Sequence, residues 1–172
     1  SLRPWPAKLM ETKMLKNTGF KSLGGGVALA GAFVISFAMG AQAATPTVIT
    51  LTQTPCQFVE PEHGTDHKFK STKKADCDAI NAKSGSERLA KSKVMNLKAG
   101  DYIFRVTNKN VPYSLGFWIR GASLVDRALL PSTSGGGLTT GKTKDYKIKL
   151  KPGKYVFSCP LNPTVNHKVV VE

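Results

Sequence analysis

The sequence predicts an all-β domain, a Greek-key β-sandwich or small barrel that carries one short helical insertion. About seven short runs of alternating apolar and polar residues recur, separated by turn residues about every 8–12 positions. The chain has 172 residues. Once an N-terminal leader is removed, this leaves enough sequence for one domain.

A leader is expected in residues 1–43. Lys13, Lys16 and Lys21 precede the apolar run 27–39, and Ala41-Gln-Ala43 supplies the small residues of a cleavage site. This order is typical of a secretory signal peptide, and the run is shorter than the roughly 20 apolar residues that span a bilayer. We therefore expect a mature domain at 44–172 in the periplasm or outside the cell. An uncleaved membrane anchor is the alternative interpretation.

The chain is strongly basic. It holds 25 Lys and Arg against 11 Asp and Glu, a formal charge of +14. Residues 1–43 contain five of the bases and one of the acids, so 20 bases and 10 acids remain. Export and the absence of a basic cluster interleaved with aromatic residues argue against nucleic acid. An acidic periplasmic protein partner is a better explanation of this charge, with an anionic membrane surface or solubility as alternatives.

The first half of the domain is predicted to hold one strand and the insertion. Val48–Thr52 is β-branched and alternating, as in a strand. An insertion of about thirty residues follows this strand, which is too long for a bare loop. Its residues 71–90 are expected to be helix and loop, with Lys73–Lys83 helical until Gly85 ends the helix.

The second half is predicted to be mostly strand. Val94–Leu97 and Tyr102–Thr107 flank a Lys-Ala-Gly-Asp turn and are interpreted as a hairpin. Ser114–Arg120 is a further strand, and residues 121–142 are expected to be a loop with a helical turn near 124–130.

The last two predicted strands, Tyr155–Cys159 and His167–Val171, carry the most informative residues. The strand before these two is also clear, because Tyr146, Ile148 and Leu150 alternate with lysines. Tyr155–Cys159 then ends at a proline, and His167–Val171 alternates again. A thiol therefore ends one strand and an imidazole begins the next, so we expect Cys159 and His167 to face one small site.

These residues resemble the cupredoxin family of blue copper proteins. The resemblance rests on Lys151-Pro-Gly-Lys-Tyr-Val-Phe-Ser-Cys-Pro160, the short loop and the Val-rich last strand, and on Asn108-Lys-Asn-Val-Pro-Tyr-Ser-Leu-Gly-Phe117. It implies a cupredoxin-like fold and copper as the cofactor. Cys159 stands at the family's thiolate position, Tyr113 and Asn162 replace its two histidines, and His167 stands at its axial position.

These residues at the ligand positions are compatible with three functions. Cys159 and His167, helped by Tyr113, could hold a soft ion such as Cu(I) in a non-catalytic metal-handling protein. Alternatively, the site has been lost and the scaffold is a metal-free interaction module. The third function, electron transfer, is what the resemblance to the family implies, but the residues at the ligand positions do not match those of a blue-copper centre. An enzyme is not expected, because no nucleophile and base pattern is legible.

A second metal candidate consists of His63, His67, Glu60 and Glu62, whose imidazoles and carboxylates would suit Cu(II), zinc or iron. Ordinary hydrophilic loop composition is the alternative.

The cysteines predict one disulfide. Export favours disulfide formation, and Cys56 and Cys77 are close in sequence, so we expect them to pair and leave Cys159 as a free thiol. A zinc site is the competing interpretation, but no pair has the spacing of zinc ribbons.

Residues 136–143 match the phosphate-binding pattern G-x-x-x-x-G-K-[ST]. An alternating strand follows where that mechanism needs a helix. We interpret this match as a coincidence in a flexible loop and expect no nucleotide.

Overall fold

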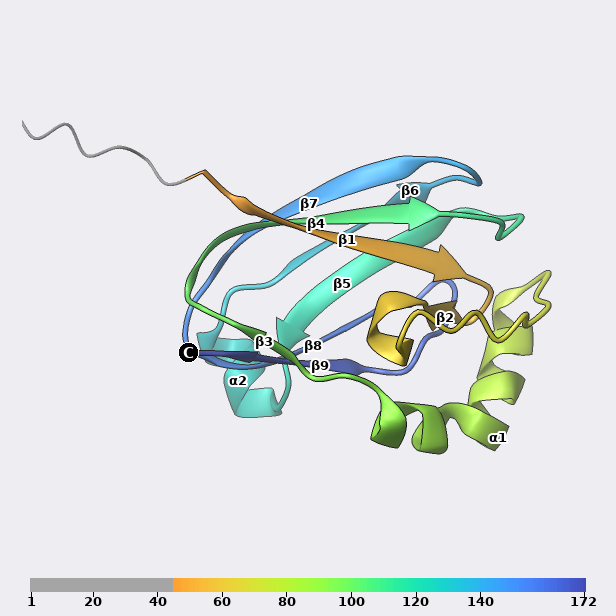
Figure 1. Cartoon of the computed structure of the whole chain (residues 1–172), viewed down its shortest axis with the longest axis horizontal. Coiled ribbons are helices and arrows are strands. Elements are labelled where there is room, and N and C mark those ends of the chain that lie inside the picture. Colours follow the sequence, from red (N-terminus) through yellow and green to blue (C-terminus); the bar gives the residue numbers. More distant parts are fainter. Residues whose placement is uncertain (1–44) are drawn as a thin grey trace, which may run out of the picture. The chain divides into compact units, whose positions relative to one another are not determined.

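The computed structural model describes residues 45–172, and the predicted signal peptide lies outside these residues. The described residues form two β-sheets that face each other across one apolar core (Figure 1). The predicted all-β sandwich with a helical insertion is therefore confirmed.

One sheet has four strands in the order β2-β1-β4-β7. Its members are β1 (Thr47–Thr54), β2 (Gln57–Phe58), β4 (Gly100–Asn108) and β7 (Thr143–Leu150). β1 runs parallel to β4, and β4 pairs with β7 in antiparallel register.

The other sheet has five strands in the order β3-β9-β8-β5-β6. Its members are β3 (Met95–Leu97), β5 (Leu115–Gly121), β6 (Thr133–Leu138), β8 (Gly153–Ser158) and β9 (His167–Val171). β8 pairs with β9 and with β5, both antiparallel, while β3 runs parallel to β9. Alternating side chains of both sheets, among them Phe104, Phe117 and Phe157, fill the space between them.

The predicted hairpin is wrong, although both of its strands exist. β3 belongs to the five-stranded sheet and β4 to the four-stranded sheet, so Lys98 and Ala99 cross between the sheets. The turn residues identified a change of direction. They could not reveal that Ala99 N–H donates to the carbonyl of Glu172 at 2.8 Å, which joins this segment to the last strand.

The insertion contains η1 (Glu60–Glu62) and α1 (Lys74–Lys91), with α1 beside β2 and η1 (Figure 1). The helix was expected to end at Gly85 and instead continues for six residues. Gly85 is buried, and a Cβ there would lie 3.2 Å from a methyl group of Val165. This glycine therefore allows helix and loop to approach closely, and the packing outweighs its low helix propensity of about 1 kcal/mol.

Residues 121–142 are more ordered than the sequence suggested. The expected helical turn is present as α2 (Leu124–Leu129), and β6 occupies residues that were expected to be loop. Residues 136–143 run from β6 through a turn into β7, with no helix after them.

Candidate functional site

Cys159 lies directly after β8 at one end of the core. Its side chain is buried and makes no disulfide. The sulfur accepts hydrogen bonds from the backbone N–H groups of Gly116 at 3.4 Å and Asn162 at 3.2 Å. Burial raises the pKa of the Cys159 thiol, and the backbone donors only partly offset this. The group is therefore a protonated thiol at neutral pH.

Asn162 forms the centre of the loop that follows, and both the oxygen and the nitrogen of its side-chain amide are hydrogen-bonded. Its Oδ1 accepts from the backbone N–H of Cys56 at 2.9 Å and from the Tyr113 hydroxyl at 3.1 Å. Its Nδ2 donates to the carbonyl of Thr54 at 3.0 Å. Asn162 is fully buried, so this amide joins the loop to the end of β1 and to the Tyr113 segment.

Tyr113 is held beside Asn162 by the turn that precedes it. The Asn108 side chain shapes this turn: its Oδ1 accepts from Val111 N–H at 2.9 Å, and its Nδ2 lies 3.2 Å from the carbonyls of Val111, Tyr113 and Leu138. The Tyr113 hydroxyl also shares a 2.7 Å hydrogen bond with Ser71. Burial raises the pKa of Tyr113, so its phenol stays neutral.

The predicted disulfide between Cys56 and Cys77 is confirmed. It joins the turn between β1 and β2 to α1 across 21 residues. Cys56 adopts a left-handed backbone conformation with φ of 65°. The Cys77 sulfur lies 3.1 Å from Asn162 Oδ1, so the bridge borders the same loop.

His167 is part of the core, opposite Phe157 in the pairing of β8 and β9. Its ring packs against Phe58 and Phe157, with centroids 6.0 and 5.3 Å away. Its Nε2 lies 3.7 Å from Glu62 Oε1, beyond hydrogen-bond distance, and neither ring nitrogen has a hydrogen-bond partner. Burial, only partly opposed by Glu62, lowers the pKa of His167 to about 4.

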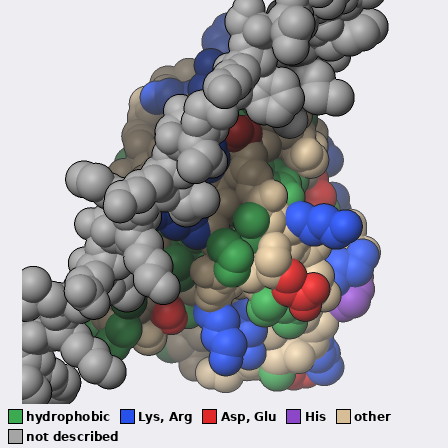
Figure 2. Space-filling view, turned by 90° about the vertical axis from the view of Figure 1, so that its left-hand side faces the viewer, with side chains coloured by type: hydrophobic (Ala, Val, Ile, Leu, Met, Phe, Trp, Pro, Cys, Tyr) green, Lys and Arg blue, Asp and Glu red, His purple; other side chains and the backbone are tan. Residues whose placement is uncertain are grey.

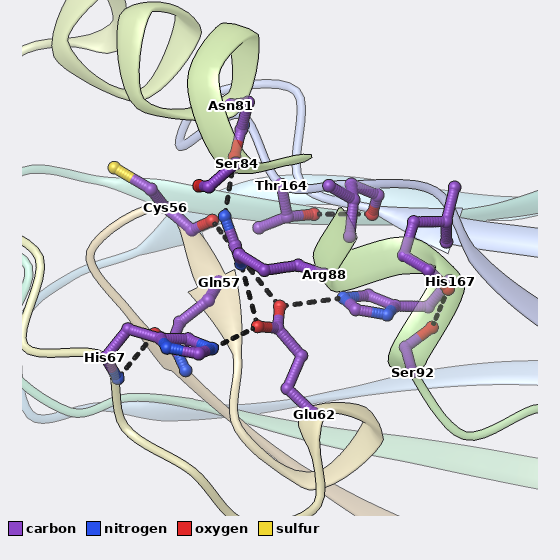
Figure 3. Close-up of polar contacts among 12 residues, drawn as sticks. Cys56, Gln57, Glu62, His67, Asn81, Ser84, Arg88, Ser92, Thr164 and His167 are labelled. Atoms are coloured by element: carbon purple, nitrogen blue, oxygen red, sulfur yellow. Dashed lines mark hydrogen bonds and ion pairs between the residues drawn. The ribbon is translucent and has the colours of Figure 1, made fainter. Parts of the chain in front are cut away.

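His167 therefore faces a buried ion pair (Figure 3). Glu62 of η1 accepts from Arg88 of α1 through both of its oxygens, at 2.7 and 2.8 Å, and from His67 Nε2 at 2.8 Å. Arg88 also donates to Asn81 and to the carbonyl of Cys56. The Glu62 and Arg88 side chains are only 3% and 7% exposed, so this buried pair fixes α1 against η1.

The remaining members of the second metal candidate point elsewhere. His63 Nε2 lies 2.8 Å from the carbonyl of Lys91, and Glu60 accepts from the backbone N–H of Thr52 at 2.7 Å. Of the four residues, only Glu62 and His67 meet directly. Within residues 45–172, no three His, Cys, Asp or Glu side chains are arranged to hold a metal ion.

The donor set at Cys159 does not fit copper. Tyr113 and Cys159 are joined through Asn162, and the amide oxygen between them is already hydrogen-bonded to Cys56 N–H and to the Tyr113 hydroxyl. His167 lies 3.7 Å from Glu62 and packs against two phenylalanine rings, and no hydrogen bond joins its ring to Cys159. A blue-copper centre needs two imidazoles and a thiolate in one plane.

An apolar groove of about 390 Å³ adjoins the Cys159 loop, and sequence reasoning missed it. Its lining residues come from β5, from β6 and from the loop: Gly116, Phe117, Trp118, Ser134, Gly135, Gly136, Pro160 and Leu161. The signal that could have revealed it is the run Gly135-Gly-Gly137, because glycines leave a strand without side chains to fill its surface.

Comparisons with known proteins give only distant likenesses. No protein-family model matches the chain, and no curated protein matches it. Among solved structures, auracyanin B is 11% identical with a TM-score of 0.45, and the match covers 76% of this chain and 93% of that one. A reduced amicyanin variant is 17% identical with a TM-score of 0.33, covering 48% of this chain and 71% of that one.

The copper nitrite reductase of Nitrosomonas europaea is 16% identical with a TM-score of 0.39, and the match covers 74% of this chain and 42% of that one. At these values, the likenesses assign neither family membership nor an activity to this chain.

Proposed function

We propose that this chain is an exported, non-catalytic interaction module that uses a cupredoxin-like sandwich as a scaffold without copper. The observation that carries this proposal is that both polar atoms of the Asn162 side chain are hydrogen-bonded to other residues of the protein. Its amide fills the centre of the loop where the resemblance implies a metal, and it binds Cys56, Tyr113 and Thr54 instead.

The Cys56–Cys77 disulfide supports export, because such bonds persist in oxidising compartments. In the part of the chain that the structure describes, no helix is long and apolar enough to cross a membrane.

The groove beside the Cys159 loop is the surface that we assign to the partner. It is mainly apolar, and Leu161 at its margin is 45% exposed. The chain's excess of Lys and Arg favours an acidic protein as that partner.

Metal loading of wild type and Cys159→Ser tests the proposal. Purified protein is incubated with Cu(I) and with Cu(II), desalted, and its bound copper is counted. We expect no stoichiometric copper in either protein, because no three His, Cys, Asp or Glu side chains of residues 45–172 are arranged to hold a metal ion. His63→Gln serves as a control for copper bound adventitiously at the surface.

One copper per chain in wild type, absent from Cys159→Ser, would contradict the proposal and support the soft-metal alternative. An intense visible thiolate-to-copper band would support an electron carrier instead.

A further inference from the structure

The short helix α2 exposes an unusual amount of apolar surface. Leu124, Val125 and Leu129 are 83%, 67% and 71% exposed. Three aliphatic side chains thus project from six consecutive residues, whereas the other large exposed apolar side chains of residues 45–172 lie apart, at Val48, Val94 and Leu161. A cluster of this kind typically marks an interaction surface.

Several features fix α2 against the end of β5. A Cβ on Gly121 would come within 2.2–2.5 Å of the backbone of Asp126 and Arg127, so only glycine allows the helix to lie this close. Ser123 and Asp126 form a reciprocal capping box. On the far side, Leu130 packs against Gly153. The apolar side chains are therefore presented on a rigid support.

Cations lie on α2 and on the outer faces of the two strands β8 (Gly153–Ser158) and β9 (His167–Val171). Arg127 lies on α2 itself, and the carbonyl of Lys154 on β8 accepts from the backbone N–H of Ala122, which places that strand beside the helix. Lys168 follows on the outer face of the neighbouring strand, paired with Val156. All three basic residues are exposed, and the carboxylate of Asp126, the one acid on α2, is used by the cap.

Figure 2 shows the side of the molecule on which α2 lies, and hydrophobic side chains adjoin Lys and Arg side chains in its lower half. Projecting aliphatic side chains next to cations match the interfacial region of a bilayer, where acyl chains lie below anionic headgroups. A second copy of the chain fits less well, because a symmetric contact would bring the same cations together.

We propose that α2, with Arg127, Lys154 and Lys168, docks this protein peripherally on an anionic phospholipid surface. Leu124, Val125 and Leu129 enter the interfacial layer, and the three cations lie at the headgroups. This inference is independent of the groove and of the absence of copper.

Co-sedimentation with vesicles tests it. The probes are vesicles of phosphatidylcholine alone and of phosphatidylcholine mixed with phosphatidylglycerol, and every variant is made in the full chain so that residues 1–44 are common to all. Wild type should bind the anionic vesicles more tightly, and added salt should weaken this binding. Replacing Leu124 and Leu129 by serine should lower the affinity about tenfold or more. Lys154→Ala should lower it about fivefold.

Val48→Ser is the matched control, because Val48 is also exposed but lies on β1, and it should leave the affinity unchanged. Circular dichroism and thermal melting check that each variant is folded. Equal binding by wild type and the double serine variant would overturn the proposal. So would equal affinity for neutral and anionic vesicles, or binding to a soluble acidic polypeptide without binding to vesicles.

Discussion

His167 is a neutral imidazole enclosed by phenylalanine rings, with Glu62 and Arg88 as the charged groups that face it. Because burial lowers its pKa to about 4, the folded protein takes up the proton only in strong acid. The unfolded chain takes it up near the ordinary value of about 6.5. The proton therefore favours the unfolded state between these two values.

We expect the free energy of unfolding to be independent of His167 above about pH 6.5, to fall as the pH drops towards about 4, and to level off below that. The predicted loss from this residue is about 3 kcal/mol. Urea denaturation across this pH range checks it, with His167→Phe as the comparison, because phenylalanine preserves the aromatic packing and cannot titrate. Parallel pH profiles of the two proteins would contradict this prediction.

At this scale, the sequence predicted the disulfide and the free cysteine correctly, because pairing depends on compartment and proximity along the chain. It could not predict the environment of His167. The alternation placed the ring on the inner face of its strand, but its neighbour Glu62 comes from the insertion, 105 positions earlier in the chain. Which of Cys159 and Glu62 it would approach depends on packing that no local pattern describes.

Among the elements, β6 lies close to β5 because glycines stand where the two strands meet. A Cβ on Gly116 of β5 would lie 2.8 Å from the carbonyl oxygen of Gly135, beside the irregular register between Leu115 and Phe117. A Cβ on Gly136 would lie 3.7 Å from Leu161, an ordinary contact. A methyl group on Gly116 would therefore clash with the backbone of β6, whereas one on Gly136 would make an ordinary contact.

We expect Gly116→Ala to lower the free energy of unfolding by about 1–3 kcal/mol, since the backbone must shift to admit the methyl group. Gly136→Ala, the matched control in the same groove, should change it much less. Chemical denaturation of both variants measures the difference. Similar destabilisation by the two substitutions would show that the spacing of β5 and β6 is not the limiting factor.

Elements with a clear hydrophobic period were predictable, and those defined by glycine were not. β1, β5, β7, β8 and β9 follow from alternation, whereas the glycines of β6 and Gly85 of α1 look like breakers in a sequence. In both places tertiary packing decides, because a missing side chain allows another backbone or side chain to approach.

For the molecule as a whole, the Glu62–Arg88 pair is a buried polar link between η1 and α1, and Arg88 also reaches the turn between β1 and β2 through the carbonyl of Cys56. Its groups are buried and satisfied together, so removal of one leaves the other without its partner in an apolar setting. The arrangement of the insertion was beyond sequence analysis, because Glu62 and Arg88 are 26 residues apart.

We expect Arg88→Met to lower the free energy of unfolding by about 3–5 kcal/mol. Lys91→Met on the same helix breaks an exposed pair with Glu87 and should change it little. Thermal unfolding of the two variants, supported by proteolysis to detect a loosened α1, measures the effect. If both melt like wild type, the insertion must be held mainly by the disulfide and apolar contacts.

The position of Asn162 affects thiol–disulfide exchange among the three cysteines, Cys56, Cys77 and Cys159. A free thiol so near a disulfide would ordinarily attack it and reshuffle the bridge, a reaction that requires the thiolate. Here Asn162 lies between them, with its backbone N–H on the Cys159 sulfur and its Oδ1 beside the Cys77 sulfur. Because burial also keeps Cys159 protonated, the native Cys56–Cys77 connectivity is insulated from exchange for as long as this loop stays closed.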